Sequence, residues 1–294
     1  MKRTTRFRQL IEAPDIAVMP GVHDALSARI AEQVGFEVVT CGGYAASAAL
    51  LGRPDTSQLS MTEMADHYAR LCDAVSIPVF GDGDTGFGNV TNVARTVRAY
   101  ERAGLAGMFI EDQVYPKRCG HMAGKAVVPA EEMVAKLKAA LDSRADPEFV
   151  IMARTDALAV NGLEDALARM ALYREVGADL LFVEAPETVE QMRRICTELD
   201  GPCLANNIEA GASPVLSAAT LQEIGYAVTT HPVAATYTVA KAVRELLETL
   251  LRDGTTDAVR DRMVDFAEFN EIVGLSELRH REQDYLEFAR TKTP

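Results

Sequence analysis

The chain is short of basic residues. Its 294 residues include 30 lysines and arginines against 43 aspartates and glutamates, a net charge of −13 at neutral pH. Nucleic-acid binding needs a basic face that meets the phosphates. The composition therefore predicts no nucleic-acid partner, and we expect the basic residues near the N-terminus to lie on a solvated first helix.

Long apolar runs and paired cysteines are also missing. No apolar run approaches the roughly 20 residues of a membrane helix, so we expect no membrane partner. The first residues are basic but lack the apolar core of a secretory signal. The five cysteines have neither close-spaced pairs nor zinc-site spacing. Together these absences predict a protein of the reducing cytoplasm.

Eight short apolar runs recur along the chain and are mostly separated by helical patterns. The runs are near-continuous rather than alternating, which is typical of parallel strands covered on both faces. Eight such units predict a (β/α)8 TIM-type barrel over residues 1–240. The runs are Ile16–Met19, Phe36–Thr40, Ile77–Phe80, Gly107–Ile110, Phe149–Ala153, Leu180–Val183, Cys203–Ala205 and Tyr226–Thr229.

A helical C-terminal extension, residues 241–294, follows the predicted barrel. Helical patterns cover Tyr237–Arg252, Ala258–Phe269 and Leu275–Ala289. The last two of these helices are not needed to complete a (β/α)8 barrel. We expect their apolar stripes to pack on a neighbouring subunit or on the barrel floor.

Polar residues follow the predicted strands at the end where a barrel carries its active site. They are Asp82, Asp84, Glu111, Arg154, Glu184 and Asn206, with Asp55 in the loop after the second strand. Crowded carboxylates repel one another unless a cation lies among them. Oxygen ligands without a histidine pair suit Mg²⁺ or Mn²⁺. We expect Asp82, Asp84 and Glu111 to bind that ion, with Asp55 acting through water.

Two further predictions concern the same strand ends. Arg154 is suited to hold a substrate carboxylate through two hydrogen bonds. For Asp112 and Asp156 we expect satisfied polar groups or helix caps.

One polar segment after the fourth strand carries a cysteine among cations. It holds Lys117, Arg118, Cys119 and His121, in that order. Positive neighbours favour the thiolate, and the glycines at 120 and 124 permit a tight turn or a mobile lid. Alone, such a segment is typical of a solvated loop with an inert cysteine. Beside a ring of carboxylates it predicts a catalytic acid/base.

Other motifs leave alternatives open. The stretch Gly81–Gly86 fits the G-x-G-x-x-G dinucleotide pattern, but two aspartates inside it would repel a pyrophosphate. A nicotinamide-dependent oxidoreductase is one alternative function on this basis. A storage or scaffold barrel without catalytic activity is another, and it would bind no Mg²⁺.

Several blocks resemble one known superfamily. Lys117-Arg118-Cys119-Gly120-His121 is similar to the K-[KR]-C-G-H signature of the isocitrate lyase and phosphoenolpyruvate mutase superfamily. The stretches Gly81–Gly88, Glu111–Gln113, Phe149–Gly162 and Leu204–Asn206 resemble its other blocks. The resemblance implies a (β/α)8 barrel, a Mg²⁺ ion, a mobile cysteine loop and a homotetramer with an exchanged C-terminal helix.

The resemblance also implies roles for individual residues. Asp82 would bind the metal, with Asp84, Asp55 and Glu111 around it. Arg154, Glu184 and Asn206 would contact a small carboxylate substrate, and Lys117, Arg118, Cys119 and His121 would carry the catalysis. The family usually has Ser or Thr where this chain has Gly42; the backbone amides of Gly43 and Tyr44 remain to hold a substrate carboxylate.

The expected reaction is cleavage of a carbon–carbon bond in a 2-hydroxy di- or tricarboxylate. A substrate of the 2-methylisocitrate or 2,3-dimethylmalate type would give pyruvate and a carboxylic acid. A phosphonomutase of the carboxyphosphonoenolpyruvate type, or an oxaloacetate-cleaving enzyme, is the alternative on the same fold.

Overall fold

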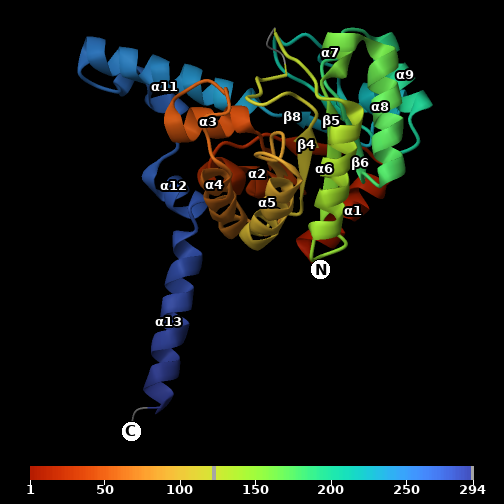
Figure 1. Cartoon of the computed structure of the whole chain (residues 1–294). Helices are drawn as coiled ribbons and strands as arrows, with labels where there is room; N and C mark the ends of the chain where they lie inside the picture. Colours follow the sequence, from red (N-terminus) through yellow and green to blue (C-terminus); the bar gives the residue numbers. More distant parts are fainter. Residues whose placement is uncertain (121–123, 293–294) are drawn as a thin grey trace. The chain divides into compact units, whose positions relative to one another are not determined.

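The computed structural model describes residues 1–120 and 124–292. Contacts divide the chain into two units, Met1–Thr236 and Tyr237–Pro294. The first unit contains eight strands at its centre with helices around them (Figure 1). The strands are β1 (Ala17–Pro20), β2 (Val39–Cys41), β3 (Val79–Asp82), β4 (Gly107–Glu111), β5 (Val150–Thr155), β6 (Leu180–Val183), β7 (Leu204–Asn206) and β8 (Val228–His231).

The strands follow one another around a ring. Five of them form a parallel sheet in the order β2-β3-β4-β5-β6, and three form a second in the order β1-β8-β7. Single parallel bridges, Gly21 to Thr40 and Leu181 to Cys203, join the two sheets at both seams. The predicted (β/α)8 barrel is therefore confirmed, with two weakly paired seams.

Within the described residues, the first unit contains ten complete helices. They are α1 (Arg3–Glu12), α2 (Ala25–Val34), α3 (Gly43–Leu51), α4 (Met61–Ala74), α5 (Val90–Ala103), α6 (Ala130–Ser143), α7 (Ala157–Asn161), α8 (Leu163–Val176), α9 (Val189–Glu198) and α10 (Ala218–Ile224). Side-chain caps fix several starts, as at Ser60, whose hydroxyl accepts from the Glu63 amide. The short helices α3 and α7, which directly follow β2 and β5, were not predicted.

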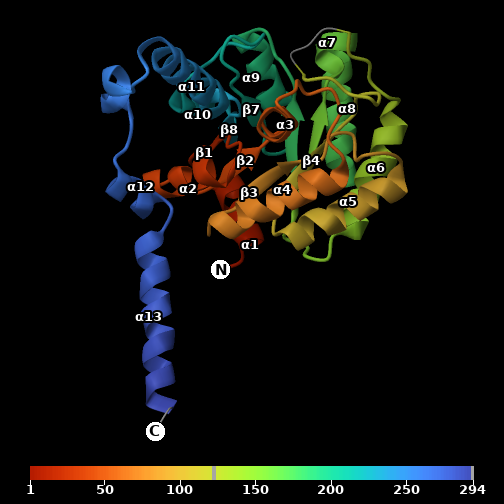
Figure 2. The same ribbon diagram turned by 90° about the vertical axis from the view of Figure 1, so that its left-hand side faces the viewer.

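Two apolar layers hold the barrel together. Inside the ring, side chains such as Phe80, Phe109 and Met152 pack with Phe7 and Ile11 of α1. Helix α1 lies beneath the strands in Figure 2, at the end opposite α3 and α7. Outside the ring, a larger cluster fills the space between strands and helices. Because α1 and this packing close the amino end, the carboxyl ends of the strands are left for polar groups.

The second unit is helical. It contains most of α11 (Ala234–Asp253), a 3-10 helix (Asp257–Arg262), α12 (Phe266–Ile272) and α13 (Leu275–Lys292). The predicted single helix over Ala258–Phe269 is wrong. The chain leaves the helical conformation after Arg262, and the Asp265 side chain caps a new helix by accepting from the Glu268 amide. None of the described helices is long and apolar enough to cross a bilayer.

Two buried tyrosines anchor the last residue of β3. The Tyr68 hydroxyl on α4 accepts from the Asp82 amide at 2.7 Å and lies 2.9 Å from the Cys41 carbonyl oxygen. The Tyr100 hydroxyl on α5 donates to the Asp82 carbonyl at 3.0 Å. Side chains from two of the surrounding helices therefore fix the backbone at Asp82.

We expect Tyr68→Phe to lower the free energy of unfolding by about 1–3 kcal/mol, because it leaves the buried Asp82 amide without an acceptor. Tyr100→Phe is the matched control. It removes one bond to a carbonyl that Tyr68 also contacts, so its effect should be smaller. Urea unfolding of both variants makes the comparison. An equal or larger loss for Tyr100→Phe would contradict this account.

Candidate active site

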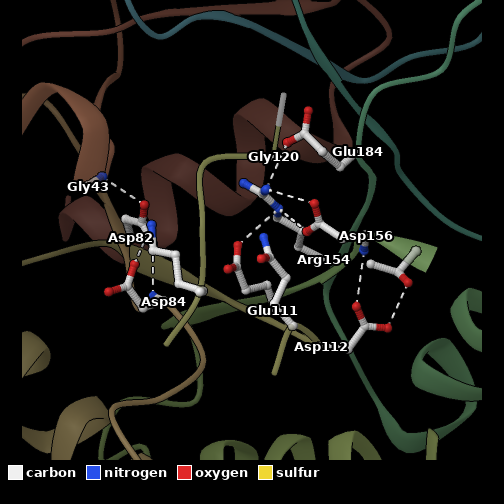
Figure 3. A network of polar contacts seen from close by, with 12 residues as sticks. Gly43, Asp82, Asp84, Glu111, Asp112, Gly120, Arg154, Asp156 and Glu184 are labelled. Atoms are coloured by element: carbon white, nitrogen blue, oxygen red, sulfur yellow. Dashed lines mark hydrogen bonds and ion pairs between the residues drawn. The ribbon is translucent and has the colours of Figure 1, made fainter. Parts of the chain in front are cut away.

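Polar side chains meet at the carboxyl ends of β3 to β6 (Figure 3). They form two adjoining groups. The acidic cluster consists of Asp55, Asp82, Asp84 and Glu111 with Lys117 among them, and the arginine cluster consists of Arg154 with Glu111, Asp156 and Glu184. Glu111 belongs to both. Most of the predicted rim residues therefore lie together, although they come from five strands and their loops.

Backbone amides orient the aspartates of the acidic cluster. The Asp82 carboxylate accepts from the Gly43 amide at 2.7 Å and from the Asp84 amide at 2.8 Å. Asp84 adopts a positive φ of 47°, a conformation that aspartate tolerates better than most residues. The Glu111 amide donates to the Asp84 carbonyl at 2.9 Å. The loop after β3 is thus tied to both β2 and β4.

Lys117 is the cation of the acidic cluster. Its Nζ lies 2.7 Å from Asp55 Oδ2 and 2.8 Å from Asp84 Oδ1, and its side chain is 4% exposed. Burial alone would lower the pKa of this ammonium. The surrounding carboxylates of Asp84, Asp82, Glu111 and Asp55 raise that pKa well above its usual value. Lys117 is therefore held in its charged form.

In the acidic cluster the carboxylates outnumber the cation, Lys117. Burial raises the pKa of Asp84 to about 7, although Lys117 opposes the shift. Burial also raises the pKa of Glu111 well above its usual value, against the effect of Arg154. Glu111 Oε1 is buried and has no hydrogen-bond partner among the described residues. These oxygen donors fit a hard divalent cation in chemistry.

The arrangement around Lys117 is not a preformed chelate. Within residues 1–120 and 124–292, no three Asp, Glu, His or Cys side chains are grouped so that they could hold a metal ion. Asp55 and Asp84 bind the ammonium instead. A divalent ion would add to, or compete with, the charge that Lys117 supplies.

Arg154 is surrounded by carboxylates from three loops or strands. Its Nε lies 3.1 Å from Glu111 Oε2 and 3.0 Å from Asp156 Oδ2, and its Nη2 lies 3.1 Å from Glu184 Oε2. The carboxylates raise the pKa of Arg154, although burial alone would lower it. In the described part of the chain all of these contacts use Nε and Nη2.

Aromatic rings and amides complete the surroundings of the guanidinium. The rings of Phe109 and Phe182 lie 5.6 and 5.1 Å from the Arg154 Cζ. Asn206 Nδ2 donates to the Glu184 carboxylate at 3.3 Å, while its Oδ1 is buried without a partner among the described residues. Thr230, beside Asn206 in the strand register, has a buried hydroxyl that meets no hydrogen-bond partner in residues 1–120 and 124–292. Thr230 was not among the residues predicted from the sequence, although it lies one residue before the end of β8.

The segment that carries Cys119 is attached at both ends. Two residues before the cysteine, Lys117 binds the acidic cluster. One residue after it, Gly120 packs on the arginine cluster so closely that a Cβ there would lie 2.3 Å from Arg154 Nη2 and 2.6 Å from Glu184 Cγ. Only glycine fits at position 120 without displacing that ion pair. The Cys119 backbone therefore lies between a residue bound to the acidic cluster and a residue packed on the arginine cluster.

The other predicted residues of this segment differ in position. The Arg118 backbone is held by the Gln113 side chain, which accepts at 3.1 Å and donates at 2.9 Å, while the Arg118 side chain is exposed. His121 lies outside the described residues. Tyr44 is half-buried in the first turn of α3, next to Gly43.

Asp156 is a satisfied buried group, one of the two roles expected for it, and not a helix cap. It precedes α7, but its side chain makes no cap hydrogen bond. Its carboxylate instead binds Arg154 and the Lys125 ammonium, the latter at 2.7 Å. Asp112 is a satisfied buried group, as expected, and accepts from Thr155, Tyr173 and the Asp156 amide. The sequence analysis missed Lys125, because a lysine after a glycine gives no sign of a distant partner.

The fold and these clusters define a (β/α)8-barrel protein with a buried, acidic site at the carboxyl ends of its strands. Residues 7–251 match the family model described as phosphoenolpyruvate phosphomutase. The chain belongs to the phosphoenolpyruvate mutase and isocitrate lyase superfamily, as the motifs predicted.

Individual relatives support this membership. The chain is 46% identical to a 2,3-dimethylmalate lyase of Eubacterium barkeri, over 97% of this chain and 99% of that protein. It is 45% identical to a chloroplastic carboxyvinyl-carboxyphosphonate phosphorylmutase of Arabidopsis thaliana, over 92% of this chain and 81% of that protein. A solved structure of a 2,3-dimethylmalate lyase, 35% identical, superposes with a TM-score of 0.91 and covers 97% of this chain and 96% of that one.

The raised pKa of Asp84 makes the stability of the metal-free protein depend on pH. The carboxyl titrates near 3.8 when unfolded and near 7 when folded, so the folded state holds the extra proton between these values. The resulting stabilisation is complete below the unfolded pKa and is lost as pH rises through the folded one. In EDTA, Asp84→Asn should flatten this decline, as measured by urea unfolding from pH 4 to 8. The exposed Asp66→Asn is the control, and identical pH slopes for wild type and Asp84→Asn would contradict the prediction.

Proposed function

We propose that the protein is a Mg²⁺-dependent carbon–carbon lyase that cleaves a 2-hydroxy di- or tricarboxylate into a 2-oxo acid and a second carboxylic acid. The observation that carries the proposal is the position of Cys119 between the acidic cluster and Arg154. A substrate that bridges the two clusters would present its central bond to the thiol. Such a substrate has carboxylates at both ends, as 2,3-dimethylmalate and 2-methylisocitrate have.

The acidic cluster is the proposed metal site. We assign Asp82, Asp84 and Glu111 as ligands, with Asp55 nearby. Mg²⁺ or Mn²⁺ bound there would stabilise negative charge on a substrate oxygen. Support comes from the oxygen-only donor set and from the unpartnered Glu111 Oε1.

The arginine cluster and the start of α3 are the proposed carboxylate sites. Arg154 Nη1 would pair with one carboxylate, and Glu184 and Asn206 would bind polar groups beside it. Gly43 and Tyr44 begin α3, where the helix amino end favours an anion. The Gly43 amide also holds Asp82, which would link substrate binding to the acidic cluster.

The proposed chemistry is a retro-aldol or retro-Claisen step. The 2-hydroxyl loses its proton to the acidic cluster, and its oxygen becomes the carbonyl oxygen of the 2-oxo acid. The electron pair of the broken C–C bond moves to the carbon beside the second carboxylate. The Cys119 thiol donates a proton to that carbon, assisted by the positive charges of Lys117 and Arg118 and by His121.

The alternative reaction is rearrangement of a phosphorus–carbon bond. It is supported by the 45% identity to the Arabidopsis phosphorylmutase. Turnover of carboxyphosphonoenolpyruvate, followed by phosphorus NMR, separates it from the lyase.

We propose further that the protein acts in the cytoplasm as a homotetramer that exchanges its C-terminal helices. The barrel would end near residue 240 and the contact region would cover residues 241–294. Support comes from large apolar side chains of this region that are more than half exposed: Leu247, Leu251, Phe266, Leu278, Tyr285, Leu286 and Phe288.

The function is tested by release of 2-oxo acid in the presence of Mg²⁺. The substrates to compare are 2,3-dimethylmalate, 2-methylisocitrate, isocitrate, citramalate and oxaloacetate. Cys119→Ala should lower kcat by about 10²–10⁴-fold, the usual contribution of a general acid. Cys196→Ala, at a half-buried cysteine of α9, is the matched control. Undiminished turnover by Cys119→Ala would exclude the proposed mechanism.

The metal site is tested by two neighbouring glycines. A Cβ at Gly43 would lie 3.2 Å from carboxylate oxygens of Asp55 and Asp82 and 3.3 Å from Lys117 Nζ, whereas one at Gly42 meets only Asp82, at 3.8 Å. Gly43→Ala should therefore weaken Mg²⁺ binding several-fold and Gly42→Ala should not. Isothermal titration calorimetry measures both affinities. Equal affinities for the two variants would place the metal elsewhere.

A further inference from the structure

Asp156 is a buried carboxylate with two cationic partners. Its side chain is 0% exposed, and its Oδ2 accepts from Arg154 Nε at 3.0 Å. Its Oδ1 accepts from Arg154 Nη2 at 3.3 Å and from Lys125 Nζ at 2.7 Å. Figure 3 shows it beside Arg154, on the side away from the acidic cluster. Both oxygens are therefore used, and one carboxylate orients the guanidinium through two of its nitrogens.

Lys125 connects this carboxylate to the segment that carries Cys119. Its side chain is 4% exposed, and its ammonium also donates to the Gly120 carbonyl oxygen. Gly120 is the neighbour of Cys119 and packs against the same Arg154–Glu184 pair. Lys125 thus binds both the backbone of Gly120, next to the Cys119 thiol, and the Asp156 carboxylate that contacts Arg154.

Asp112 fixes the backbone of Asp156 through hydrogen bonds. Its Oδ1 accepts from the Asp156 amide at 3.0 Å. Its Oδ2 accepts from Thr155 Oγ1 at 2.7 Å, Tyr173 at 3.0 Å and Arg169 at 3.2 Å. The backbone that carries Asp156 is therefore fixed by a fully buried network, which sets the position of its carboxylate.

We propose that Asp156 and Lys125 are positioning residues, which orient Arg154 toward the substrate and hold Gly120, and with it Cys119, against that arginine. The assignment rests on the proposed function for its effect on turnover. Neither side chain needs to touch the substrate. The pair makes the position of the thiol depend on the same carboxylate that orients the substrate-binding arginine.

A purely structural role makes a different prediction. Arg154 keeps Glu111 and Glu184 as partners if Asp156 loses its charge, so the guanidinium would stay buried and paired. If Asp156 only balanced charge, its neutral replacement would change stability and leave the thiol where it is. The reactivity of Cys119 therefore separates the two roles.

The test uses Asp156→Asn, Lys125→Met and the double variant. Misplacement of catalytic groups by about 1 Å lowers rates by about 10²-fold, so each single variant should lower kcat/KM by at least about tenfold. Asp156→Asn should raise KM, because Arg154 binds the substrate, whereas Lys125→Met should act mainly on kcat. The two losses should be less than additive, because they remove one interaction. Lys125→Arg should restore part of the rate.

A second readout does not depend on turnover. Iodoacetamide labelling of Cys119, followed by mass spectrometry of its peptide, should change several-fold in rate in both variants, while labelling of Cys196 in the same samples stays constant. Lys138→Met and Asp142→Asn remove an exposed ion pair of α6 and serve as matched controls. Thermal unfolding reports whether each variant is folded, and Lys125→Met gives the same test if Asp156→Asn does not fold.

The outcomes separate this proposal from the proposed function. Unchanged Cys119 labelling and unchanged kinetic constants in folded variants, or fully additive losses, would overturn the positioning role. If the wild type cleaves none of the 2-hydroxy acids but its variants still show the altered labelling, the lyase assignment fails and the positioning role stands.

Discussion

The structure depends on the neutralisation of charge that is buried at one end of a barrel. Lys117 and Arg154 are almost fully removed from solvent, and each is stable there only because several carboxylates surround it. Burial, with a smaller contribution from neighbouring carboxylates, raises the pKa of Asp84 and Glu111. Removing either the cations or the carboxylates alone would leave uncompensated buried charge.

The barrel meets this constraint by placing the charges on its most rigid parts. Asp82, Glu111 and Arg154 are strand residues, and the strand ends are fixed in turn by groups on the surrounding helices, as Tyr68 and Tyr100 fix Asp82. Apolar side chains and α1 fill the interior below. The arrangement leaves a polar layer that is ordered before any substrate arrives, which is what preorganised catalysis requires.

Close backbone approach is the second feature of the site. Gly120 lies directly on the Arg154–Glu184 pair, and Gly43 lies against Asp82 and Lys117. Side chains at either position would separate the groups that the ion pairs bring together. The cysteine segment therefore reaches both clusters through its backbone and its two lysines, which explains how one loop serves the acidic and the arginine clusters at the same time.

The sequence by itself determined the eight units, the parallel strands, the polar residues at the strand ends and the cysteine segment, because apolar periodicity and local motifs are properties of neighbouring residues. It did not determine α3, α7 or the break after Arg262, and for Asp156 it left a satisfied polar group and a helix cap as alternatives. Only the tertiary structure decided that Lys117 binds Asp55 and Asp84, and that Lys125 joins Asp156 to Gly120. Ion pairs between residues 31 to 62 positions apart depend on which loops the closed ring brings together, and no local pattern contains that information.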